Sequence, residues 1–175
     1  LPVSLFTRTA HLPTITLTLI KIQNGTTVKV PDFFFEERAA DLGFRLIAGV
    51  DEAGRGAWSG PVVASAVILE RDILPLKLLE GINDSKKLTK GKREELCQLL
   101  PDYAAIGVGL VEPLEIDQIN VLQASHRAME GAIAKLNPPP EYVLVDGNIS
   151  PTLTCAGEPV VRGDSKSFSI AAASI

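Results

Sequence analysis

The segment at residues 62–70, VVASAVILE, is apolar at almost every position. Such near-continuous apolar character predicts a strand that is buried on both faces, as in the middle of a sheet covered by helices. Further runs predict strands along the rest of the chain, at residues 44–51, 104–111, 141–147 and 159–164. Because helical patterns separate these runs, the sequence constrains the chain to an α/β fold with helices packed on a sheet.

Helices are expected between the strands, and polar residues mark where they begin and end. Asp84 and Ser85 are placed to cap an amphipathic helix, and Asn137 with three prolines ends a long one. The final helix is still running at the last residue. The expected helices cover residues 32–42, 83–100, 112–136 and 165–175.

Residues 1–30 differ from the rest of the chain in composition, since they contain no Asp or Glu. Within them, TITLTLIKIQNGTTVKV alternates Thr with Ile and Leu before an Asn-Gly pair, a pattern typical of a β-hairpin with a two-residue turn. We therefore expect two parts, with residues 1–30 as an extension that carries the hairpin and residues 31–175 as the main domain.

The composition bounds the kinds of protein that this chain can be. Its 175 residues, 46% of them hydrophobic, suffice for one globular domain with a full core. No apolar run approaches the roughly 18 residues of a membrane span, so we expect no membrane partner. Cys97 and Cys155 lack the spacing of a zinc site or a disulfide framework, which favours a cytoplasmic location. The net charge of −4 disfavours a broadly basic surface, so any binding of nucleic acid must be local.

Acidic residues stand where three of the predicted strands end. Asp51 and Glu52 follow the first strand, Asp146 ends another, and Asp164 closes the last. If these ends gather at one edge of the sheet, four carboxylates converge, and their repulsion is tolerable mainly when a divalent cation neutralises it. Oxygen-only ligands suit Mg²⁺ or Mn²⁺.

Each acid also has a simpler explanation. An Asp after a strand is commonly a turn former or a helix N-cap, which applies to Asp146 and Asp164 taken singly. Asp51 and Glu52 are neighbours, and neighbours on a regular strand point to opposite faces. They can share a metal only if the strand twists or ends there, which the glycines of the following Ala-Gly-Arg-Gly permit.

Four motifs follow one another over residues 44–175: IAGVDEAGRGAWSGPVVASAVIL, INDSKKLTKGKREEL, YVLVDGN and VRGDSKSFSIAAASI. Together they resemble ribonuclease HII, the type 2 ribonuclease H of bacteria. The resemblance implies a ribonuclease H-like fold with a central mixed five-stranded sheet flanked by helices. It also implies a Mn²⁺- or Mg²⁺-dependent endonuclease that hydrolyses the RNA strand of RNA–DNA hybrids. On ribonucleotide-containing duplex DNA we expect a nick 5′ to the ribonucleotide, which leaves 3′-hydroxyl and 5′-phosphate ends.

The resemblance also assigns roles to residues of this sequence. The acids that hold two metal ions in the family, and so carry catalysis, match Asp51, Glu52, Asp146 and Asp164. The family's Gly-Arg-Gly reads the ribose 2′-hydroxyl, the group that separates RNA from DNA. The expected substrate-binding residues are Gly54, Arg55 and Gly56, with Lys86, Lys87 and Lys166 on the backbone of the nucleic acid.

Members of that family continue past the last helix with a basic segment and further helices. We therefore expect this chain to be a C-terminally truncated part of a longer protein that acts as a monomer. Two alternatives stay open: a non-catalytic fragment that binds hybrids, and a metal-dependent exonuclease of the related four-acid kind. The Gly-Arg-Gly after the first acids favours the ribonuclease, since a ribose sensor has no use in a general exonuclease.

Overall fold

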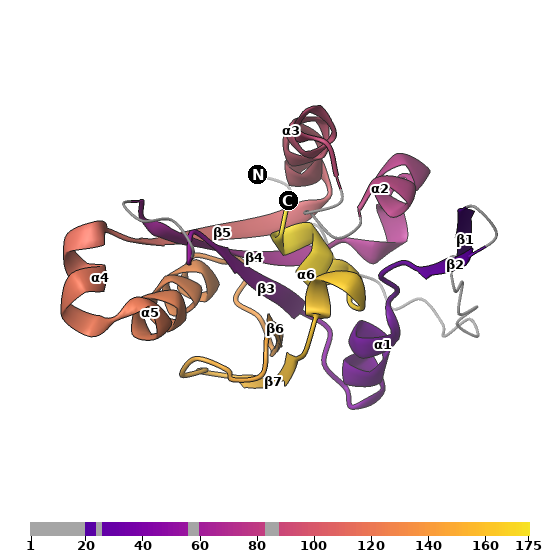
Figure 1. Cartoon of the computed structure of the whole chain (residues 1–175). Helices are drawn as coiled ribbons and strands as arrows, with labels where there is room; N and C mark the ends of the chain where they lie inside the picture. Colours follow the sequence, from indigo (N-terminus) through magenta and orange to yellow (C-terminus); the bar gives the residue numbers. More distant parts are fainter. Residues whose placement is uncertain (1–19, 24–25, 56–59, 83–87) are drawn as a thin grey trace, which may run out of the picture.

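The computed structural model describes residues 20–23, 26–55, 60–82 and 88–175 (Figure 1). Its centre is a mixed five-stranded sheet with the strand order β5-β4-β3-β6-β7, which confirms the fold class predicted from the sequence. The pairs β3–β4 and β4–β5 are antiparallel, and β3–β6 and β6–β7 are parallel. The strands are β3 (Ile47–Ala53), β4 (Val62–Leu69), β5 (Ala104–Val111), β6 (Tyr142–Asp146) and β7 (Ala156–Val160).

Helices cover both faces of this sheet. One face packs against α5, and the other packs against α6 together with α1, α2 and α3. Short 3₁₀ helices, η1 (Arg71–Ile73), η3 (Leu100–Asp102) and η4 (Gly163–Ser165), lie between these elements. The helices are α1 (Phe34–Asp41), α2 (Leu76–Gly81), α3 (Lys90–Leu99), α4 (Pro113–Ile119), α5 (Val121–Ala134) and α6 (Phe168–Ala173).

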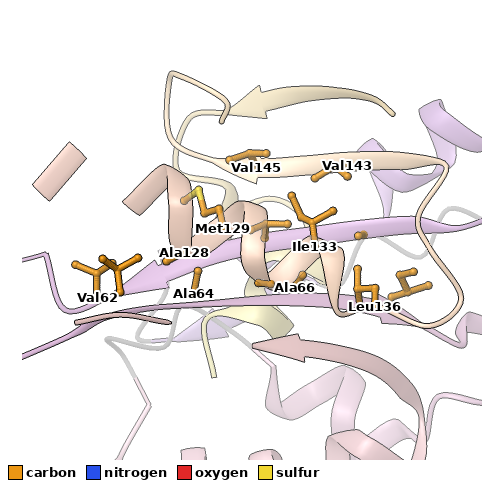
Figure 2. Close-up of a cluster of buried hydrophobic side chains, with 14 of the residues drawn as sticks. Val62, Ala64, Ala66, Ala128, Met129, Ile133, Leu136, Val143 and Val145 are labelled. Carbon is orange, nitrogen blue, oxygen red and sulfur yellow. The ribbon is translucent and has the colours of Figure 1, made fainter. Parts of the chain in front are cut away.

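The helix α5 lies directly on the sheet. Its buried alanines recur every four residues, at Ala124, Ala128 and Ala132, so they share the face of the helix that touches the strands. On β5, a Cβ atom at Gly107 or Gly109 would overlap the carbonyl oxygens of these alanines, so only glycine allows this close approach. Figure 2 shows the resulting cluster of buried side chains between α5 and the strands.

The opposite face of β3 is covered by α6 (Figure 1). Here the helix backbone touches the strand backbone, because a Cβ at Gly49 would overlap the carbonyl carbon of Ser169 and the amide nitrogen of Ile170. Phe168 and Ile170 are almost fully buried beneath the helix. The position of α6 is therefore fixed relative to β3 at a point two residues before Asp51.

Two helix predictions differ from the structure. The long helix expected at residues 112–136 is wrong, because the chain breaks at Asn120 into α4 and α5. Asn120 has φ of 70°, and its side chain accepts hydrogen bonds from the amides of Leu122 and Gln123, so it caps α5. The helix α3 is capped by Thr89, whereas Asp84 and Ser85 lie outside the described residues.

The predicted N-terminal hairpin is confirmed in its strands. β1 (Ile20–Gln23) and β2 (Thr26–Lys29) pair antiparallel, with Gln23 opposite Thr26, while the Asn-Gly turn lies outside the described residues. The division of the chain into residues 1–30 and 31–175 stays a prediction. Among the helices that the structure describes, none is long and apolar enough to cross a membrane.

The contact at Gly49 yields a test of the packing. We expect Gly49→Ala to lower the free energy of unfolding by about 3 kcal/mol or more, because the new methyl group meets backbone that cannot move aside. Gly91→Ala on α3 is the matched control, since its Cβ meets no atom within 4 Å, and it should be neutral or stabilising. Urea denaturation measures both, and equal stabilities of the two variants would contradict this packing.

Candidate active site

The parallel pairing of β3 with β6 brings two acids together. Val50 lies opposite Val145 in this pair, so the next residues, Asp51 and Asp146, stand side by side where β6 ends. Alternation along each strand places both acids on the face that α6 covers. Gly147, with φ of 110°, then turns the chain out of the sheet.

Asp164 also lies near Asp51 and Asp146, but in a 3₁₀ helix and not at the end of a strand as predicted. The strand expected at residues 159–164 ends at Val160, and Asp164 lies in η4, between β7 and α6. The amide of Gly163 donates a hydrogen bond of 2.6 Å to Oδ1 of Asp146, which ties this turn to the end of β6. Asp164 is buried, with 8% of its surface exposed. The turn therefore brings Asp164 to the edge where Asp51 and Asp146 lie.

Glu52 is separated from these three acids by the regularity of its strand. β3 continues to Ala53, so Glu52 points to the opposite face of the sheet from Asp51. Its side chain is 10% exposed and forms an ion pair of 2.9 Å with Nη1 of Arg55. The structure thus brings Asp51, Asp146 and Asp164 together on one face of the sheet. Glu52 lies at the same edge but on the opposite face.

The electrostatics of the site centre on Asp51. Burial, followed by the negative charge of Asp146, raises the pKa of Asp51 from 3.8 to about 8. The carboxylates of Glu52 and Asp164 act in the same direction, and only the hydrogen bond from the Glu52 amide, 2.7 Å long, opposes them. Each of the other three acids therefore disfavours the charged form of Asp51.

The four acids can be assessed as ligands of a metal ion. Within the described ranges, no group of three or more His, Cys, Asp or Glu side chains is placed so that it could hold a metal ion. The donor set nevertheless fits a hard divalent cation in kind, because it consists of carboxylate oxygens alone. The pKa of Asp51 is raised first by burial and then by repulsion from Asp146, and such a cation would relieve that repulsion. Metal binding by Asp51, Glu52, Asp146 and Asp164 stays a prediction.

The predicted substrate-binding residues are described in part. Gly54 follows β3 with φ of 98°, and a Cβ there would overlap the carbonyl oxygen of Pro61. Arg55 is half exposed beside Glu52. Lys166 follows η4, two residues after Asp164. Gly56, Lys86 and Lys87 lie outside the described residues.

One buried acid near the site was missed by the sequence analysis. Glu36 on α1 is 2% exposed, and its Oε1 accepts hydrogen bonds from Ser167 and Ser169. The only signal in the sequence is that Glu36 follows three phenylalanines and precedes a second Glu, which is ordinary for the first turn of a surface helix.

Comparison with known proteins decides the family. The family model described as Ribonuclease HII matches residues 48–175, a range that holds all four acids and α6. The chain belongs to the ribonuclease HII family. Ribonuclease HII of Ruegeria pomeroyi is 50% identical to it over 146 residues, which are 83% of this chain and 61% of the relative. Ribonuclease HII of Geobacter sulfurreducens is 54% identical over 144 residues, which are 81% and 64% of the two chains.

A solved structure of the family shares the fold. The crystal structure of ribonuclease H2 from Pyrococcus horikoshii is 30% identical and superimposes with a TM-score of 0.62, over 74% of this chain and 69% of that chain. The chain described here spans about three fifths of the length of the curated relatives that it matches.

The raised pKa of Asp51 predicts how stability depends on pH. Asp51 keeps its proton in the folded protein up to about pH 8, whereas the unfolded chain releases it at about pH 4. Its contribution to the free energy of unfolding is therefore fully present below about pH 4 and is lost as the pH rises to about 8. In metal-free protein, Asp51→Asn should therefore have a melting temperature about 2 °C or more above that of wild type at about pH 8. This difference in melting temperature should be smaller at about pH 5. Calorimetry with chelator measures this, with the exposed Asp102→Asn as control. A gap that does not change with pH would contradict it.

Proposed function

We propose that this chain carries the catalytic centre of a ribonuclease H. Its substrates are then RNA–DNA hybrids and duplex DNA with embedded ribonucleotides, and the product of the second is a nick 5′ to the ribonucleotide with 3′-hydroxyl and 5′-phosphate ends. The observation that carries the proposal is the pairing of Asp51 with Asp146 beside Asp164, in a chain that belongs to the ribonuclease HII family.

In this proposal the acids hold Mn²⁺ or Mg²⁺. Asp51, Asp146 and Asp164 share one face of the sheet, and Glu52 joins them if its side chain leaves Arg55 and turns around the end of β3. When bound, two divalent cations would stabilise the attacking and the leaving oxygen of a displacement at phosphorus. Asp146 is held for this role by the amide of Gly163, which fixes one of its two carboxylate oxygens.

The residues after β3 would read the substrate. Gly54 lacks a side chain and has a backbone conformation that other residues rarely adopt, so its peptide groups can approach a ribose closely. A backbone amide or carbonyl at that point can then hydrogen-bond to the 2′-hydroxyl. Arg55 is half exposed and presents a fork of donors suited to a phosphate or sugar oxygen near the scissile bond.

Replacement of one acid tests the catalytic role. Asp146→Asn keeps an oxygen that can accept from the Gly163 amide, so the variant should fold with an unchanged or higher melting temperature. It should lose several kcal/mol of charge stabilisation, which lowers the cleavage rate by about a thousandfold. End-labelled duplex DNA with one internal ribonucleotide, incubated with Mn²⁺, Mg²⁺ or chelator, measures the rate and maps the cut. Asp102→Asn, an exposed acid in η3, is the control and should cut like wild type.

The same assay separates the alternatives. Metal-dependent cutting by wild type and Asp102→Asn, with full activity retained in Asp146→Asn, would refute the metal role of Asp146. A binding-only fragment would retain hybrid affinity that metal does not change and would leave the label uncut. An exonuclease would shorten the strands from their ends and ignore the internal ribonucleotide.

A further inference from the structure

Glu36 is a buried acid that has no role in the proposed function. Its side chain is 2% exposed on α1, and burial of a carboxylate is costly unless hydrogen bonds compensate it. Three donors converge on Oε1: Ser167 Oγ at 2.6 Å, the Ser169 amide at 2.9 Å and Ser169 Oγ at 2.6 Å. Among the described residues, Oε2 has no hydrogen-bond partner. The hydrogen bonds that this carboxylate makes to the described residues therefore all go to the start of α6.

The start of α6 is connected to the candidate site by a short and tightly bonded segment. Ser167 caps α6 by accepting from the amide of Ile170, and its own amide donates to the carbonyl of Gly163 at 2.8 Å. Gly163 in turn donates to Asp146, and Asp164 lies within this turn. Movement of Ser167 would therefore be transmitted to Asp164 and to the contact with Asp146.

The backbone before Glu36 strengthens the same connection. The Asp32 amide donates to the carbonyl of Lys166 at 3.1 Å, and the Phe168 amide donates to the carbonyl of Asp32 at 3.0 Å. The ring of Phe33 stacks on that of Phe168, with 4.8 Å between the centroids. The segment that enters α1 thus holds both sides of Ser167, and Glu36 completes the contact with its three hydrogen bonds from Ser167 and Ser169.

We propose that Glu36 is a positioning residue of the site: through Ser167 and Ser169 it fixes the turn that carries Asp164 and Lys166. The role of Asp164 as a metal ligand rests on the proposed function, whereas the coupling between Glu36 and the turn stands on the contacts alone. Metal sites depend on partners outside the ligand shell that hold each ligand in place, and their loss typically weakens metal binding by about 10- to 100-fold.

The test compares three variants of this chain. Glu36→Ala removes the acceptor, whereas Glu36→Gln keeps an oxygen where Oε1 lies and puts its amide nitrogen where Oε2 has no partner. Glu37→Ala is the matched control, because the neighbouring Glu37 pairs with Arg71 at 3.1 Å and not with α6. Hydrogen exchange of metal-free protein reports on residues 163–170, and calorimetric titration gives the affinity for Mn²⁺.

We expect Glu36→Ala to speed exchange at residues 163–170 and to weaken Mn²⁺ binding, each by about tenfold or more. Glu36→Gln and Glu37→Ala should stay within about threefold of wild type. If Glu36→Ala does not fold, Ser169→Ala, which removes one of the three donors, provides the same readouts with a smaller expected effect.

The outcomes test separately the coupling of Glu36 to the turn and the effect of Glu36 on metal binding. Unchanged exchange at residues 163–170 in Glu36→Ala overturns the coupling, whether or not the protein binds Mn²⁺. Faster exchange and a lower melting temperature with unchanged Mn²⁺ affinity would show that Glu36 serves stability alone, which overturns its role at the site. If wild type binds no Mn²⁺, the proposed function fails, while the exchange data still decide the coupling.

Discussion

The parallel pairing of β3 with β6 is the interaction on which the rest of the structure depends. β3 has a hydrogen-bonded neighbour on each side and a helix on each face, so its residues 47–50 are buried. Because the two parallel strands run in the same direction, Asp146, the last residue of β6, lies beside Asp51 of β3, two residues before that strand ends. The same pairing that builds the core therefore brings Asp51 beside Asp146. Gly49 then allows α6 close enough to deliver the turn with Asp164.

This arrangement concentrates acidic side chains at a partly buried edge of the sheet. Burial and three neighbouring carboxylates raise the pKa of Asp51, which means that the metal-free fold tolerates the cluster at a cost in stability. The apolar clusters on both faces of the sheet offset that cost, since they bury apolar side chains of the strands and of the helices that cover them. A site under such repulsion is suited to a divalent cation, which removes the repulsion that the fold cannot.

The sequence predicted the strands better than the helices or the site, for physical reasons. The strands β4 and β5 are apolar runs with little polar interruption, and the predicted bounds were close to those observed. The break at Asn120 was missed because apolar spacing continues across it, and only its φ of 70° separates α4 from α5. Asp51 and Asp146 could be predicted as neighbours from strand ends alone. Glu36 could not, because its partners Ser167 and Ser169 lie more than 130 residues away and belong to another helix.

We propose that Asp51 of β3, the end of β6 and η4 form a site for divalent cations. Anomalous diffraction from crystals of this chain grown with Mn²⁺ would locate such a cation. We expect a Mn²⁺ peak bounded by the carboxylates of Asp51, Asp146 and Asp164, which disappears in crystals of Asp146→Asn. Well-ordered carboxylates with no anomalous peak between them, or a peak bound elsewhere on the protein alone, would contradict it.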